Sequence, residues 1–432
     1  MKPSWCIKEL LFILIIFNGS MEFGYILVYP SPAIESMKSN GFSISSFEEK
    51  AFKSISALTA IIGPFLSNFL LHYLGRRPVA SLFGILGAIF WIMLPFMKRS
   101  FFYYGIIERG LIGITMGGYS AICPLYMVEL APPNVKGFFG TFNQVGIAFG
   151  IVVCYLIGNW ANWINLAYCG SIFSGLLGLL IWICPETKAG LQLQRQRFAK
   201  KKNLDNGALL DSVPISETPI KESIFQKKYL KDLLICCMLM FFQQFCGING
   251  ILTNITVLFK NAGISISEGI ASTISSSAQV FSAFLGGLFI DHIGCRMSLL
   301  ISIFGLVVSL LFYALSIKYN LGAWSPIIAL FLYLLLFGLG MGPIPWFIVP
   351  ESFPTSVRSI ATSIASATNW TCAFLVIFIF PFLQDKFGEF KTMLIFMCIM
   401  ILGFLFTFCF LRNPKKEQVR EQTNDLSINE TD

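Results

Sequence analysis

Long runs of apolar residues, separated by short polar segments, recur from one end of the chain to the other. A helix needs roughly 20 residues to cross the hydrocarbon core of a bilayer, and the runs reach that length. Backbone groups find no water to bond in lipid, so each run is predicted to be a helix. The predicted spans are residues 8–29, 52–73, 78–97, 102–127, 138–159, 163–184, 231–258, 268–290, 297–317, 325–348, 359–383 and 391–411.

One long polar stretch lies between predicted spans and divides them into two sets of six. We therefore expect an N-terminal bundle over residues 1–184 and a C-terminal bundle over 231–411. Residues 185–230 are then a cytoplasmic linker, and 412–432 a polar cytoplasmic tail.

The composition supports a membrane protein. Hydrophobic residues make up 55% of the chain and charged residues 12%, with a mean hydropathy of +0.72, whereas soluble domains carry about 25% charged residues. With the N-terminus placed inside, 21 of the 31 Lys and Arg residues fall on the cytoplasmic side, as the positive-inside rule requires. We expect a multi-pass protein of the cell membrane with both termini cytoplasmic. The net charge of +8 follows from this bias, and no nucleic-acid-binding module accompanies it.

A charge motif occurs once in each half, at the predicted cytoplasmic ends of the spans. An acid and a base lie seven residues apart in both copies, Glu129 with Lys136 and Glu351 with Arg358, and the copies are 222 residues apart. Such duplication is typical of carriers built from two similar bundles. We expect these charges to hold the bundles together in one state of a transport cycle and to separate in the other. The gating charges are Arg76, Arg77, Glu129, Lys136, Arg296, Glu351 and Arg358.

Several motifs follow one another in the order found in a known family. They are Leu74–Arg77, Pro124–Gly137, Pro185–Thr187, Gln243–Asn249, Asp291–Arg296, Gly340–Trp346, Glu351–Arg358 and Asn369–Trp370. On these motifs the chain resembles the sugar porters of the major facilitator superfamily, most like the facilitated trehalose and hexose transporters of insects. The resemblance implies an all-α membrane protein with twelve transmembrane helices in two six-helix bundles.

A sugar site needs uncharged side chains that donate and accept hydrogen bonds, and an aromatic ring to cover the apolar face of the sugar. Polar amides at membrane depth fit this need, although they could instead only join neighbouring helices. By resemblance Gln144, Gln243, Gln244, Asn249 and Trp346 occupy sugar-contacting positions, and Gln279 stands where many relatives have Asn. Asn369 and Phe337 complete the predicted substrate-binding set. Gly338 replaces the Glu of mammalian-type hexose carriers, which bears on the choice of sugar.

The tenth span contains glycines and prolines that a regular helix does not tolerate, among them Gly340, Gly342, Pro343 and Pro345. Each proline removes a backbone donor and pushes on the preceding turn. We expect this span to be broken beside Trp346 and to bend during transport.

The sequence favours passive transport. Proton-coupled relatives carry Asp just after Phe-Gly-Tyr in the first span, whereas here Ile26 follows Tyr25. However, Glu22 precedes that motif, and an intramembrane carboxylate is a functional candidate by default; Arg109 is its predicted partner.

The leading interpretation is a facilitative uniporter of a hexose such as glucose, or of trehalose, working by alternating access. The alternatives are a proton-coupled symporter using Glu22 and a non-transporting sugar sensor. With two His residues, and twelve Cys read as apolar packing residues, we expect no enzyme, metal site or cofactor. The partners are then a sugar and the lipid bilayer, with the oligomeric state left open and a monomer as the simplest case.

Overall fold

The computed structural model describes residues 7–131, 136–187, 190–191, 223–261, 267–354 and 356–411. Among these residues the regular structure is helical throughout. Most of the predicted linker 185–230, and all of the predicted tail 412–432, lie outside the described residues.

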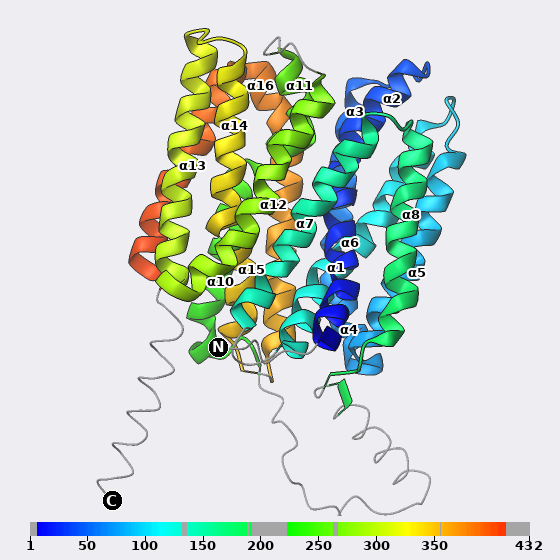
Figure 1. Ribbon diagram of the computed structural model, residues 1–432, viewed down its shortest axis with the longest axis vertical. Coiled ribbons are helices and arrows are strands. Elements are labelled where there is room, and N and C mark those ends of the chain that lie inside the picture. Colours follow the sequence, from blue (N-terminus) through cyan, green and yellow to red (C-terminus); the bar gives the residue numbers. More distant parts are fainter. Residues whose placement is uncertain are drawn as a thin grey trace, which may run out of the picture.

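Helices from the two halves of the chain gather on opposite sides of the molecule, at the right and at the left of Figure 1. The first half contains α1 (Ile7–Val28), α2 (Pro30–Ser39), α3 (Ser46–Ala60), α4 (Ile62–Leu74), α5 (Arg76–Met93), η1 (Leu94–Phe96), α6 (Phe102–Leu130), α7 (Lys136–Gly158), α8 (Trp163–Leu180) and η3 (Ile181–Ile183). The second half contains α10 (Lys227–Phe245), α11 (Ile248–Asn261), α12 (Glu268–Ile293), α13 (Cys295–Lys318), α14 (Trp324–Leu336), η4 (Phe337–Met341), α15 (Pro343–Glu351) and α16 (Arg358–Phe410).

The helix count agrees with the twelve predicted spans. Within the described residues, ten helical stretches are long and apolar enough to cross a membrane. The stretch Arg358–Phe410 counts as one, yet Gly388 within it is non-helical (φ +77°), so the predicted spans 359–383 and 391–411 lie on either side of that residue. The serine-rich α12 has 26 residues and covers the predicted span 268–290.

Three predicted spans are interrupted rather than continuous. Residues 52–73 form α3 and α4, and residues 325–348 form α14, the π-helix η4 and α15. Residues 231–258 form α10 and α11, which meet at Gly247 with a φ of +94°. A side chain strongly disfavours this left-handed backbone, so glycine allows the chain to leave one helix and start the next.

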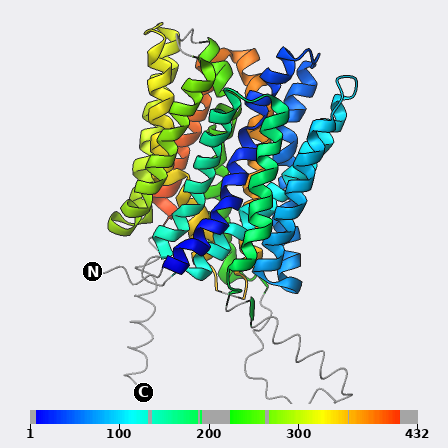
Figure 2. The same ribbon diagram turned by 45° about the vertical axis from the view of Figure 1, so that its right-hand side comes forward.

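The two halves meet along several helices near the centre of the bundle. Helices α7 and α12 lie side by side (Figures 1 and 2), and Asn159, directly after α7, donates to Thr273 Oγ1 on α12 at 3.4 Å. The first turns of α16 pack on α4, where Ser363 Oγ donates to the Pro64 carbonyl at 3.0 Å. We call the end of the bundle that carries α2 the upper end, and the end where α1 begins the lower end (Figure 1).

Candidate functional site

Four amide side chains from three helices of the second half form a continuous hydrogen-bonded chain, which we call the amide cluster: Gln243, Gln244, Asn249 and Asn369. Asn249 Nδ2 donates to Gln244 Oε1 at 2.5 Å, and Gln244 Nε2 donates to Asn369 Oδ1 at 2.9 Å. Asn369 Nδ2 then donates to Gln243 Oε1 at 2.7 Å. All four side chains are buried. The break at Gly247 makes this possible, because it brings Asn249 of α11 back against the last turn of α10.

The chain of amides ends on the backbone of the broken tenth span. Gln243 Nε2 donates to the carbonyls of Met341 and Gly342, at 3.0 and 2.7 Å. In a regular helix the Met341 carbonyl accepts from the N–H four residues later, but that residue is Pro345, which has none. The proline therefore leaves a carbonyl free to hold Gln243. The predicted break is present as the π-helix η4 followed by Pro343.

Two further predicted residues lie against Gly342, and a third, Trp346, contacts the first half of the chain. Gln144 Cδ from α7 and Phe337 Cε1 lie 3.1 and 3.0 Å from the point where a Cβ on Gly342 would stand. A Cβ at this position would therefore require both side chains to shift by a few tenths of an ångström. Trp346 contacts Phe23 of α1 edge to face, with ring centroids 6.3 Å apart. The region around the amide cluster is thus formed by both halves of the chain.

Gln279 is buried, its backbone packs against η4, and it takes no part in the hydrogen bonds of the amide cluster described above. Its backbone carbonyl lies 2.8 Å from the Cβ position of Gly338, and Ser282 Oγ lies closer still. No side chain fits at Gly338, so the space that a Glu would need in this chain is occupied by α12. The Gln279 Oε1 atom has no hydrogen-bond partner among the described residues.

A second set of buried polar side chains lies in the first half. We call it the charged cluster, and it consists of Glu22, Trp91 and Arg109. The Trp91 indole N–H donates to Glu22 Oε1. Arg109 donates to the Ile26 carbonyl at 3.0 Å, and its guanidinium lies 5.5 Å from the ring of Tyr29. Ile26 lies about one helical turn after Glu22 on α1, so the Arg109 guanidinium lies near the Glu22 carboxylate, but these two described residues form no direct ion pair. The predicted partner of Glu22 is thus a neighbour, and Trp91 is its hydrogen-bond donor.

Three of the predicted gating charges of the first half, Arg76, Arg77 and Glu129, belong to one connected group at the lower end. Arg76 Nε and Nη2 bind both carboxylate oxygens of Glu129, at 2.9 and 2.8 Å. The backbone N–H groups of Arg76 and Arg77 donate to Glu186 at 3.0 and 3.1 Å. A carboxylate at the start of α5 also complements the helix dipole. Sequence reasoning gave Glu186 no role, although it lies within the Pro185–Thr187 motif. Lys136 begins α7.

The second copy of the motif has different contacts. Arg296 Nη2 donates to the Phe408 carbonyl at 2.5 Å, and Arg358 Nε donates to the Phe353 carbonyl at 3.2 Å. Glu351 ends α15. The Arg76–Glu129 ion pair at the lower end lies within one half and does not join the two halves.

Comparisons with known proteins agree on one family. The family described as "Sugar (and other) transporter" matches residues 12–426. The facilitated trehalose transporter Tret1 of Bombyx mori is 29% identical over 425 residues, covering 93% of this chain and 84% of that protein. Tret1 of Apis mellifera ligustica is 28% identical over 430 residues, covering 94% and 85%.

Solved structures share the fold. A proton:xylose symporter of the major facilitator superfamily, XylE bound to 6-bromo-6-deoxy-D-glucose, superposes with a TM-score of 0.76 at 21% identity, covering 94% of this chain and 96% of that one. XylE from E. coli in a partially occluded inward open conformation gives 0.74 at 21% identity, covering 95% and 99%.

Proposed function

The chain belongs to the sugar transporter family, and from this we propose that it is a facilitative uniporter of a hexose or of trehalose. Relatives described as facilitated trehalose transporters match over more than nine-tenths of the chain, which supports this substrate range and this mode.

The neutral amide cluster is the observation that carries the proposal. Its side chains hold donors and acceptors at the place where both halves contribute residues, with Gln144 and Trp346 nearby. These groups satisfy one another. A sugar hydroxyl both donates and accepts, so it can replace one amide partner without leaving a buried group unsatisfied. Exchange of this kind allows binding and release.

Uptake of radiolabelled glucose, fructose and trehalose in a cell without its own carriers tests the proposal. The wild type should take up at least one sugar with saturation, and Gln243→Ala should lose most of that uptake because it opens the amide chain at its carbonyl end. Gln226→Ala is the matched control, since Gln226 is exposed at the start of α10. Full saturable uptake by Gln243→Ala would refute the site.

Alternating access is proposed for the transport cycle, with the two halves as the moving units and both termini cytoplasmic in the cell membrane. The duplicated charges at the lower end support a gate there. Glu351→Ala should slow sugar exchange while the affinity stays unchanged, and Glu351→Asp, which keeps the charge, should exchange faster than Glu351→Ala. Equal exchange rates in wild type and Glu351→Ala would refute the gate.

Proton-coupled symport is the second candidate, because Glu22 is a fully buried carboxylate. A titrating carboxylate in the membrane can carry a proton with the substrate. Accumulation of sugar against its gradient, driven by a pH gradient and abolished by a protonophore, would favour symport over uniport.

A further inference from the structure

A cavity of about 240 Å³ lies at the upper end, between α2 and α3 of the first half and α11 of the second. Its wall includes the hydroxyls of Ser31 and Thr256 and the ammonium of Lys53. These three residues are more than nine-tenths buried. The cavity therefore has polar groups fixed in its wall and is distinct from the amide cluster.

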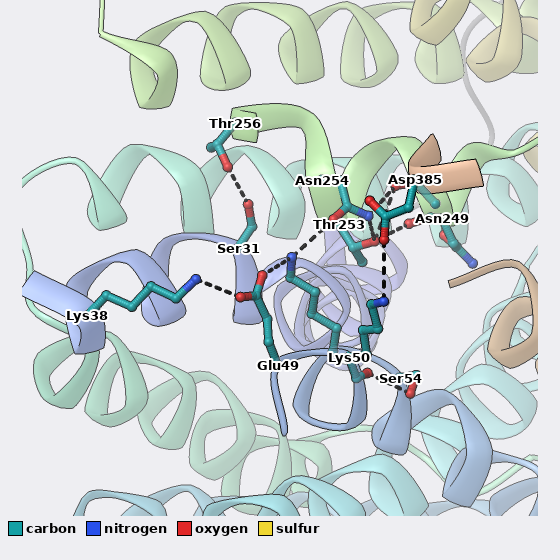
Figure 3. A network of polar contacts seen from close by, with 12 residues as sticks. Ser31, Lys38, Glu49, Lys50, Ser54, Asn249, Thr253, Asn254, Thr256 and Asp385 are labelled. Carbon is teal, nitrogen blue, oxygen red and sulfur yellow. Dashed lines mark hydrogen bonds and ion pairs between the residues drawn. The ribbon is translucent and has the colours of Figure 1, made fainter. Parts of the chain in front are cut away.

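The wall of this cavity is made of the contacts that join the two halves. Ser31 Oγ and Thr256 Oγ1 form a hydrogen bond at 2.9 Å, and Figure 3 draws this contact as a dashed line. Lys53 Nζ donates to Asn254 Oδ1 across the same boundary at 3.0 Å. It also binds Glu49 of its own helix at 2.8 Å. A ligand in the cavity would compete for the groups that close the upper end.

The charges around the cavity favour a neutral ligand with many hydroxyls. Three lysines and two glutamates line it, and they are Lys38, Lys53, Lys260, Glu35 and Glu49. An anion would meet two carboxylates there, and a cation would meet three ammonium groups. A sugar can accept from the lysines and donate to the carboxylates, and it can exchange with the Ser31 and Thr256 hydroxyls. The volume is below the roughly 300–1,000 Å³ of sites for drug-sized ligands, which favours a single ring.

The cavity is a separate place and not an extension of the amide cluster. Asn249 and Thr256 are both on α11 and are seven residues apart. At 1.5 Å per residue this is about 10 Å along the helix. Thr253 and Asn254 lie between them and bond to the backbone of their own helix, at Asn249 and Gly250.

We propose that the upper cavity is a second sugar-binding site, occupied before or after the amide cluster, whose ligand replaces the Ser31–Thr256 and Lys53–Asn254 contacts and so loosens the upper end. This inference rests on the proposed sugar transport. It assigns a role to Lys53, whose buried charge would otherwise only hold the halves together.

Equilibrium binding of radiolabelled D-glucose and trehalose to the purified full chain in nanodiscs tests the inference. The wild type should show two classes of site for at least one sugar. Gln243→Ala should remove one class. Thr256→Val keeps the side-chain volume but removes the hydroxyl, so it should weaken the other class roughly three- to tenfold. Ser31→Ala, on the opposite wall, should do the same, which keeps the test valid if one variant folds poorly.

Thr371→Val is the matched control, because the Thr371 hydroxyl bonds to Ala367 in its own helix at 2.8 Å and lies outside both sites. Both classes should be unchanged in it. A single class in the wild type, removed by Gln243→Ala and untouched by Thr256→Val, would overturn the second site and leave the proposed function intact. Absence of saturable binding of either sugar, together with absence of uptake, would overturn the proposed function itself. Binding of inorganic phosphate at the Thr256-dependent class, without sugar, would overturn the choice of ligand.

Discussion

The amide cluster and the charged cluster are both buried, but they differ in charge and in how fully their groups are paired. The amide cluster is neutral, and each of its members has a hydrogen-bond partner within it. In the charged cluster, Glu22 accepts from Trp91, while Arg109 Nε and Nη1 have no hydrogen-bond partner among the described residues.

This difference separates two tasks. A neutral amide can exchange one partner for a sugar hydroxyl at small net cost. A buried ion that loses its compensating charges and hydrogen bonds is strongly destabilised, because no water replaces them. We therefore expect the amide cluster to control sugar affinity, and the charged cluster to control stability and any coupling to protons.

The largest expected effect breaks the charged cluster. Arg109→Met removes the cation near Glu22 and leaves a buried carboxylate without a neighbouring positive charge. Glu22 and Arg109 form no direct ion pair, but a carboxylate left buried without a compensating charge costs about 3–5 kcal/mol, and we expect a loss of this order. In detergent, the melting temperature of Arg109→Met should lie well below that of the wild type. Arg99→Met, at an exposed arginine, should melt like the wild type. An unchanged melt would mean that Glu22 needs no cation.

Asn369→Leu should give the next largest effect, in the amide cluster. It removes the partner of Gln244 Nε2 and of Gln243 Oε1 together, at about 1–3 kcal/mol for each buried group left unsatisfied. Sugar affinity should fall at least about tenfold, measured as KM for uptake. The exposed Asn165 offers the control Asn165→Leu, which should keep the wild-type KM. A wild-type KM in Asn369→Leu would show that the amides only join helices.

Trp91→Phe tests whether the charged cluster can be weakened without touching sugar binding. The variant keeps an aromatic ring, which packs on Tyr29 with centroids 4.8 Å apart, but removes the N–H that Glu22 accepts. A hydrogen bond to a charged group contributes about 1.5–3 kcal/mol, so the melting temperature should fall by a few degrees. Sugar affinity should remain within about twofold of wild type. A large loss of affinity would contradict the separation of the two clusters.

The smallest effect is expected for Glu22→Gln. The variant retains an oxygen that can accept from Trp91 but cannot release a proton. Under uniport, sugar should reach the same concentration on both sides in wild type and variant, with or without a pH gradient. If the wild type accumulates sugar and the variant only equilibrates it, the charged cluster is a proton site and the protein is a symporter.

Much of the fold followed from hydropathy. The apolar runs identify helices, because lipid forces backbone groups to bond within their own segment. The glycines and prolines of residues 338–345 also indicate a broken helix, because their effect on the backbone is local. The sequence does not reveal that α10 and α11 are separate, since Gly247 is one glycine among the 36 of the chain and its left-handed backbone depends on the packing around it.

The site residues show the same difference between what the sequence predicts and what it does not. That Gln243, Gln244, Asn249 and Asn369 are polar groups at membrane depth is evident from their neighbours in the chain. The hydrogen bonds that these side chains form with one another are not evident from the sequence. The contact between the Gln279 backbone and η4 is not evident from it either.

What the sequence by itself determined is therefore where the chain is apolar, that the tenth span breaks and which polar groups enter the membrane, because these depend on local composition. Only the tertiary structure decided that Glu22 meets Trp91, 69 positions away, and that Lys53 meets Asn254, 201 positions away. Such partners depend on how each helix is rotated and packed against the others. The residue pattern within one helix does not predict that rotation.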